Sequence, residues 1–348
     1  MPFPYYLSRR DDPLAEVPED LVLPRRKEQD DPKDYVADQG LVDAVNVALL
    51  LGQPLLLTGE PGTGKTQLAY SVSWQLGFKQ PSPLVFETKS TTTAKDLFYT
   101  YDTVGRFHAA QTREGSQDAR SYITYNALGK AILLANNDPE LREYLAVDSL
   151  DQKAVHDVPG RLPAGERRRS VVLIDEIDKA PRDFPNDILN EVERMYFKIP
   201  ELGNVEVRVS EQWRPVLILT SNSEKGLPDA FLRRCVYYDI PFPEESLRKI
   251  VEARMGYLTR SIDEAISLFR LLRAPNSPLA KKPATAELLG WLTAIRAFCK
   301  RYQISEEAEG LLRNHADRLL EPTLCILIKN EADRNPARAI VQAWLQKS

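Results

Sequence analysis

The sequence predicts an α/β protein in which a parallel sheet is covered by helices on both faces and is followed by an all-helical region. Short apolar runs alternate with stretches of helical periodicity over the first two thirds of the chain. The run Pro241-Phe242-Pro243 then interrupts this pattern, and nearly every later segment is helical. A chain of 348 residues is long enough for a large sheet domain and a smaller helical one.

The elements are expected in the following order. A proline- and charge-rich tail precedes a helix that begins near residue 39. Strands are predicted at residues 54–58, 84–87, 171–174, 216–220 and 236–240, with helices at 65–76, 122–135 and 184–195. Further helices are predicted at 244–258, 262–272, 284–299 and from 306 onward. The predicted domains are the tail (1–34), a three-layer αβα core (35–243) and a C-terminal all-α domain (244–348).

Composition excludes several classes of protein. Lys plus Arg is 46 and Asp plus Glu is 50, so the net charge of -4 argues against coating nucleic acid through bulk charge, although a local basic groove stays possible. The 3 cysteines and 3 histidines lack the spacing of a disulfide framework or a zinc site. The first residues contain no apolar signal segment, and polar residues break the most apolar stretch (41–57). We therefore expect a cytoplasmic protein without a membrane span.

A glycine-rich segment follows the first predicted strand. The run Gly59-Glu60-Pro61-Gly62-Thr63-Gly64-Lys65-Thr66 fits the pattern G-x-x-x-x-G-K-[ST] of a phosphate-binding loop. Glycines let backbone N–H groups surround a phosphate, Lys65 adds a positive charge, and the Thr66 hydroxyl is a magnesium ligand. The predicted nucleotide-binding residues are Gly59, Glu60, Pro61, Gly62, Thr63, Gly64, Lys65, Thr66 and Gln67.

Two carboxylates end the third predicted strand. Asp175 is predicted to hold Mg²⁺ together with Thr66, and Glu176 to polarise the water that attacks the γ-phosphate. Taken alone, the pair could equally be a solvated acidic turn. The phosphate loop upstream favours the metal site, because a bound triphosphate needs a metal carboxylate on a neighbouring strand.

Two further segments carry candidate residues with open alternatives. Asn222, after the fourth strand, is a candidate to orient the attacking water, or it begins a turn. Arg233 and Arg234 close a short segment before the fifth strand. They could stabilise γ-phosphate charge in a neighbouring subunit, or they are surface cations at a helix end. Tyr99, Tyr101 and Phe107 could grip a substrate, but packing or simple exposure is the favoured interpretation.

The ordered motifs GEPGTGKT, VVLIDEID, LTSN and PDAFLRR resemble those of an AAA+ ATPase, and within that superfamily the chain is most similar to the MoxR group. TTAKDLFYTYD (92–102) and LGKAIL (128–133) extend the resemblance. It covers about residues 36–245, and the helical region more loosely.

The resemblance implies an αβα core, a helical lid and a hexameric ring of identical subunits with ATP and Mg²⁺ between them. It also implies that Asn222 is sensor 1, and that Arg234, or failing it Arg233, is the arginine finger. Insertions are implied near residues 93–130 and in the predicted hairpin at 196–209. A von Willebrand factor A protein is the usual partner in this group, although no residue of this chain identifies a client.

One segment departs from the MoxR pattern. That group carries an arginine, sensor 2, at the start of a lid helix, whereas this chain has Lys281-Lys282-Pro283-Ala284-Thr285-Ala286-Glu287 there. Lys282 retains a positive charge but lacks the planar fork of arginine.

Three functions are consistent with the sequence. The first is an ATP hydrolase whose cycle remodels or activates a partner protein in the manner of a chaperone. The second is an assembly module gated by nucleotide with little turnover, which the missing arginine favours. The third is a DNA-acting motor of a defence system, against which the near-neutral charge and the lack of a DNA-reading module argue.

Overall fold

The computed structural model describes residues 31–78, 82–112, 116, 118–141, 167–223, 226–256 and 259–346. The chain divides into two compact units. The sheet unit comprises Ala37–Gly59 and Gly64–Pro241, and the helical unit comprises Met1–Val36, Glu60–Thr63 and Phe242–Ser348. Most of the predicted tail (1–34) lies outside the described residues, and its last part contains the short 3-10 helix η2 (Pro32–Asp34).

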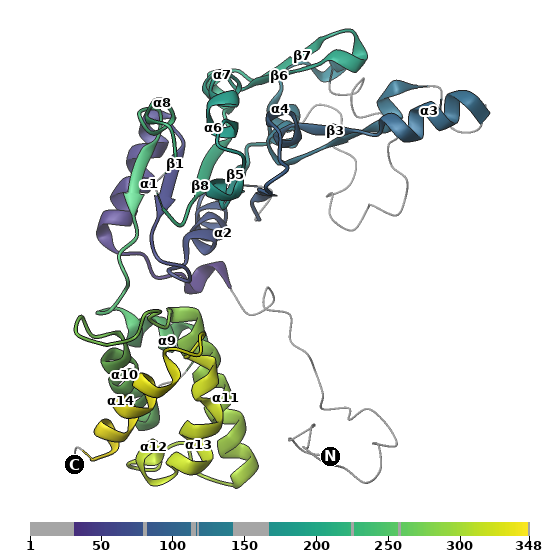
Figure 1. Ribbon diagram of the computed structural model, residues 1–348. Coiled ribbons are helices and arrows are strands. Elements are labelled where there is room, and N and C mark those ends of the chain that lie inside the picture. The colour runs from purple at the N-terminus through teal and green to yellow at the C-terminus, as the bar shows by residue number, and fades with distance from the viewer. Residues whose placement is uncertain are drawn as a thin grey trace. The chain divides into compact units, whose positions relative to one another are not determined.

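A parallel sheet of five strands is the centre of the sheet unit (Figure 1). Its strands are β1 (Leu55–Thr58), β2 (Leu84–Glu87), β5 (Val171–Asp175), β8 (Val216–Thr220) and β9 (Val236–Asp239). They lie in the order β2-β5-β8-β1-β9. Both faces of the sheet are buried, as Leu56 and Val172 on one face and Leu57 and Leu173 on the other are fully covered. The predicted α/β fold class is therefore confirmed.

Helices cover this sheet. The helix α1 (Gln39–Leu51) contacts β1 and β9, α2 (Lys65–Gln75) contacts β5 and β8, and α4 (Ala127–Ala135) contacts β2 and β5. The start of α1 is fixed by Asp38, whose side chain accepts a hydrogen bond from the Leu41 amide at 3.0 Å. The order of β1 and α2 is what brings the phosphate loop to the carboxyl edge of the sheet.

Two insertions extend from the sheet unit. The first contains η3 (Ala94–Leu97), β3 (Tyr99–Tyr101), α3 (Thr103–Thr112), η4 (Ala119–Tyr122) and β4 (Ile123–Tyr125). The second is the antiparallel hairpin of β6 (Tyr196–Ile199) and β7 (Val205–Arg208), joined through η6 (Pro200–Leu202). Gly203 and Asn204 turn the hairpin with φ angles of 74° and 63°, which glycine and asparagine tolerate best.

The two insertions are packed against each other. The Phe98 and Phe197 rings stack with centroids 5.4 Å apart. Glu201 of the hairpin accepts a hydrogen bond of 2.7 Å from the Tyr99 hydroxyl and forms an ion pair with Lys95. Tyr99 is therefore buried in packing, as the favoured interpretation held, whereas Phe107 on α3 is exposed.

Two predicted helices differ from the structure. Residues 122–125 form the end of η4 and the strand β4, because the β-branched and aromatic side chains of Tyr122-Ile123-Thr124-Tyr125 favour pairing with β3. The helix predicted at 184–195 is two short helices, α6 (Phe184–Asp187) and α7 (Leu189–Arg194). It ends before Met195, whose φ of 48° is left-handed.

The helical unit has its own core. Its helices are α9 (Leu247–Met255), α10 (Arg260–Arg273), α11 (Thr285–Tyr302), α12 (Leu311–Asn314), α13 (Ala316–Thr323) and α14 (Arg334–Gln346), with the 3-10 turn η8 (Leu324–Ile326). Trp291 is fully buried at its centre and donates a hydrogen bond of 2.8 Å to the Thr323 hydroxyl. Across the described ranges, no helix combines the length and apolarity needed to cross a membrane.

Candidate nucleotide site

The phosphate loop connects β1 to α2. Gly59, Gly62 and Gly64 have φ angles of 132°, 82° and 90°, a region that side chains with a Cβ rarely adopt. Helix α2 begins immediately after the loop at Lys65. Backbone N–H groups at the start of α2 are consequently free of helical partners and can bind an anion.

The loop tip, Glu60–Thr63, is grouped with the helical unit. Here the Thr63 hydroxyl donates a hydrogen bond of 2.9 Å to the Glu60 carbonyl group, which closes a tight turn. Pro61 is exposed at this turn, while Gln67 lies half-buried on α2. No hydrogen bond of Gln67 to the other candidate residues is seen in the described part of the chain.

Lys65 is buried at the carboxyl edge of the sheet. Its ammonium group donates hydrogen bonds to the Gly59 carbonyl at 2.7 Å and to the Asn222 side-chain oxygen at 3.3 Å. Burial lowers the pKa of Lys65, while Asp178 and Asp175 oppose that shift by their negative charge. A phosphate group at this position would supply the counter-charge that the buried ammonium group needs.

Asp175 ends β5 beside α2. The Thr66 hydroxyl lies 3.0 Å from Asp175 Oδ1, and the Thr220 hydroxyl donates to the same oxygen at 2.6 Å. A hydroxyl and a carboxylate at this separation are the oxygen donors that Mg²⁺ takes alongside phosphate oxygens. The described residues contain no group of three or more His, Cys, Asp or Glu side chains able to hold a metal. Thr66 and Asp175 therefore fit a magnesium ion that the nucleotide itself also coordinates.

Glu176 has a left-handed backbone, with φ of 56°. Its amide donates a hydrogen bond of 2.9 Å to the Thr220 hydroxyl, and its carbonyl accepts one from the Thr88 hydroxyl. Its carboxylate is paired with Lys179, and the hydrogen bond to Glu176 raises the pKa of Lys179. A strained backbone that neighbouring hydroxyl groups hold in place is typical of functional sites.

Asn222 follows β8 and contacts the turn that contains Asp178. Its amide N–H donates to Asp178 Oδ1 at 3.3 Å, and its side-chain oxygen accepts from Lys65. The structure thus brings Lys65, Thr66, Asp175 and Asn222 together at one edge of the sheet. Asp178, two residues beyond Glu176, lies beside Asn222.

Sequence reasoning missed two residues. Thr220 bonds both acidic residues, and Thr88, just beyond β2, donates to the Asp175 carbonyl at 3.1 Å as well as to that of Glu176. A threonine at the end of a strand carries little signal by itself. Only the parallel order β2-β5-β8 indicates that residues 88 and 220 flank residue 175.

Arg233 and Arg234 follow α8 (Asp229–Leu232). Both arginines are exposed, and Arg234 pairs with Glu193 at 3.2 Å and donates a hydrogen bond of 2.9 Å to the Ala230 carbonyl. Neither arginine bonds to the phosphate loop of its own chain within the described residues.

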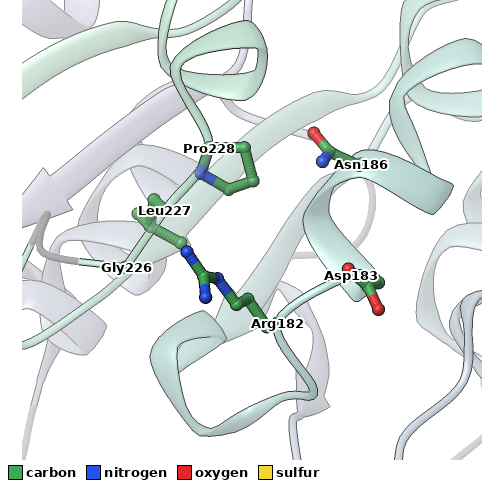
Figure 2. A pocket seen from close by; sticks show the side chains of 6 residues that line it. All are labelled: Arg182, Asp183, Asn186, Gly226, Leu227 and Pro228. Carbon is green, nitrogen blue, oxygen red and sulfur yellow. The ribbon is translucent and has the colours of Figure 1, made fainter.

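A separate hollow of 320 Å³ lies between the turn before α6 and the segment before α8 (Figure 2). Its lining residues are Arg182, Asp183, Asn186, Gly226, Leu227 and Pro228. Figure 2 shows the Arg182 side chain reaching toward Leu227. None of these residues belongs to the phosphate loop or to β5, so the hollow is not part of the candidate nucleotide site.

Comparison with known proteins agrees with this geometry. The model of the AAA domain, dynein-related subfamily, matches residues 54–235, which is more than half of the chain. No curated protein matches the sequence. Among solved structures, domain III of the Thermotoga maritima replication initiation protein DnaA matches at 15% identity and a TM-score of 0.39, covering 83% of this chain and 96% of that chain. On the family match, the chain belongs to the AAA domain family of the dynein-related subfamily and is a P-loop nucleotide-binding protein.

Proposed function

We propose that the protein is an ATP hydrolase of the MoxR type that works as a ring, hexameric in the simplest case, and uses its cycle to remodel or activate a partner protein. The observation that carries this proposal is the convergence of Lys65, Thr66, Asp175 and Asn222 at one edge of the sheet. Lys65 and the loop amides bind the phosphates, and Thr66 and Asp175 hold Mg²⁺.

Glu176 is the proposed base for hydrolysis. Its carboxylate follows directly on the metal-binding Asp175, and a glutamate in that position can polarise a water aligned with the γ-phosphate. Asn222 orients the same water from the neighbouring strand. The pairing of Glu176 with Lys179 must loosen for the carboxylate to meet water, which is feasible because both side chains are about half exposed.

Steady-state turnover of Mg-ATP tests the enzymatic part. Glu176→Gln should abolish turnover while calorimetry still registers ATP binding. Glu206→Gln is the matched control, because Glu206 lies on the hairpin and makes only exposed ion pairs with Lys198 and Arg208. Equal turnover in Glu176→Gln and the wild type would contradict the proposed function.

Subunit mixing tests the ring. If Arg234 acts on the site of a neighbour, Arg234→Ala and Glu176→Gln proteins are each inactive alone, but a mixture regains part of the activity. The gain arises because some interfaces then join an intact Glu176 to an intact Arg234. Assembly with ATP but no turnover in the wild type would favour the alternative of a nucleotide-gated assembly module.

The client is sought by capture with the trapped enzyme. Glu176→Gln protein loaded with Mg-ATP should retain the partner longest, since hydrolysis no longer releases it. A von Willebrand factor A protein is the first candidate from the resemblance to the MoxR group. Stimulation of turnover by DNA would instead support the motor alternative.

A further inference from the structure

Arg273, the last residue of α10, contacts three separate segments of the chain. Its side chain is only 9% exposed. One terminal nitrogen donates to Glu60 Oε2 at 2.8 Å, and the other donates to the Pro283 carbonyl at 2.6 Å. The guanidinium also lies over the Phe242 ring, 3.4 Å from its centroid. A single buried cation therefore joins three segments that are distant in sequence.

Each of these segments has a defined position. Glu60 is in the tip of the phosphate loop, Phe242 follows the last strand of the sheet, and Pro283 lies two residues before the first residue of α11. The loop before α11 is held from its other side too, because the buried Asp333 accepts hydrogen bonds from the Ala280 and Lys281 amides at 2.7 and 2.9 Å. These hydrogen bonds hold in position the loop that carries the Pro283 carbonyl, the acceptor of Arg273.

The start of α11 also contacts the phosphate loop. A Cβ atom built at Gly62 would lie 2.9 Å from the Ala284 Cβ, so only glycine fits the loop at this point. Ala284 stands in the segment where the resemblance places an arginine. Lys282, the substitute suggested from sequence, makes no hydrogen bond or ion pair with the described residues. The cation that reaches the loop comes instead from α10.

Because Arg273 holds Glu60 and the peptide before α11 at the same time, we propose that it is the positioning residue by which the helical unit sets the conformation of the phosphate loop. This inference rests on the proposed nucleotide-binding function of that loop. Arg273 does not touch the nucleotide in this proposal. It restricts the loop tip to the turned conformation, so that less conformational freedom is lost when phosphate binds.

The linkage acts in both directions. If Arg273 favours the loop conformation that binds nucleotide, bound nucleotide must stabilise the contacts of Arg273 by the same factor. The planar fork adds to this role beyond its charge, because a lysine has one ammonium group and cannot hold two acceptors in the same fixed geometry. Burial strengthens the contact to Glu60, whose own side chain is 53% exposed.

The test measures Mg-ATP affinity of the full-length protein by calorimetry, in the Glu176→Gln background, together with KM and kcat in the otherwise unmodified protein. Arg273→Ala should weaken ATP binding about tenfold and raise KM by a similar factor, while kcat changes by less than about threefold. Arg273→Lys should recover part of the affinity. Arg248→Ala, which removes an exposed ion pair with Asp263 in the same unit, should change neither.

A variant of Glu60, the partner of Arg273, provides the second test of the inference. Glu60→Gln removes the carboxylate charge without disturbing the core of the helical unit, so it remains informative even if Arg273→Ala fails to fold. It should weaken binding in the same direction, and its effect should not add to that of Arg273→Ala. Wild-type affinity in Glu60→Gln, or multiplying effects in the double variant, would overturn the inference. A wild type that binds ATP without hydrolysing it would refute only the proposed turnover, whereas absence of binding would overturn both.

Discussion

The hydroxyl group of Thr220 lies 2.6 Å from Asp175 Oδ1 and donates a hydrogen bond to it. The same hydroxyl oxygen accepts the Glu176 amide. One threonine on β8 thus fixes both the side chain of the metal-binding candidate and the backbone of the hydrolytic candidate. Each member of this trio lies on a strand or directly at its end, where the hydrogen bonds of the sheet limit movement.

Thr220→Val should therefore impair catalysis more than stability. Valine has the same shape but leaves Asp175 and the Glu176 amide without their shared partner. A hydrogen bond to a charged group contributes about 1.5–3 kcal/mol, so turnover should fall about 10–100-fold. Thr220→Ser keeps the hydroxyl and should retain most activity. Steady-state kinetics beside urea unfolding checks this, and equal turnover in the valine variant would refute the role of Thr220.

Lys65→Met should abolish ATP binding and leave the fold intact. Burial lowers the pKa of Lys65, so without nucleotide the charged form is less favourable in the folded chain than in the unfolded chain. That penalty is complete at pH values below the folded pKa, shrinks as the pH rises above it, and is gone above the unfolded value of 10.5. At neutral pH the nucleotide-free variant should consequently melt no lower than the wild type. Thermal unfolding with and without Mg-ATP measures both effects.

The stability of Lys65→Met relative to the wild type should also depend on pH. Its advantage should shrink as the solution becomes more alkaline, because the wild-type lysine then loses its proton in the folded state. A variant that loses several degrees at neutral pH would show that the hydrogen bonds of Lys65 to Gly59 and Asn222 outweigh its burial.

Glu201→Gln should weaken the junction between the two insertions. Burial raises the pKa of Glu201, but hydrogen bonds from Lys95 and Tyr99 outweigh it, and the pKa is lowered from 4.5. The carboxylate therefore contributes stability that is complete above pH 4.5 and is lost as the pH falls through the lower folded value. The Glu201 side chain is only 18% exposed, whereas that of Lys95 is 45% exposed. We therefore expect Glu201→Gln to lower the free energy of unfolding by about 1–2 kcal/mol at pH 7.

Denaturant unfolding measures the free energy of unfolding of Glu201→Gln and the wild type from pH 7 down to pH 3. The difference between the two proteins should become smaller as the pH falls. Glu206→Gln serves as the comparison on the same hairpin, where exposed partners should make the change much smaller. A constant difference across the whole pH range would contradict the ionic origin of the contact.

Gly129→Ala should destabilise the sheet unit. A Cβ at this position would lie 1.9 Å from the Phe98 carbonyl oxygen, and a backbone atom cannot move aside as a side chain can. Overpacking of this kind costs about 1–3 kcal/mol. Gly290→Ala, on an exposed turn of α11 where the new methyl group meets only ordinary contacts, should instead stabilise the helix by about 0.5–1 kcal/mol. Urea unfolding of both variants tests the contrast.

The sequence predicted the sheet well because its strands are short, apolar and bounded by recognisable motifs. Leu55 to Thr58 and Val171 to Asp175 could be placed almost to the residue, since a phosphate loop and a pair of acids follow them. The insertions were less predictable. Tyr122 to Tyr125 looked like the start of the next helix, and only pairing with residues 99–101 makes that segment a strand.

The candidate site was predictable for residues within motifs and not for those that act through tertiary contacts. Lys65 and Asp175 belong to patterns that the chemistry of phosphate and magnesium requires. Thr88 and Arg273 belong to none, because their importance arises from partners 87 and 213 positions away in the chain. Such residues become visible only when strand order and loop packing are known.

The hairpin of β6 and β7 follows α7, and the chain returns to the sheet at Val216, the amino end of β8, which pairs with Val171 of β5. The hairpin contacts the first insertion through the hydrogen bond between Glu201 and Tyr99 and through the stacked rings of Phe197 and Phe98. Because these contacts join them, displacement of either insertion should displace the other with it.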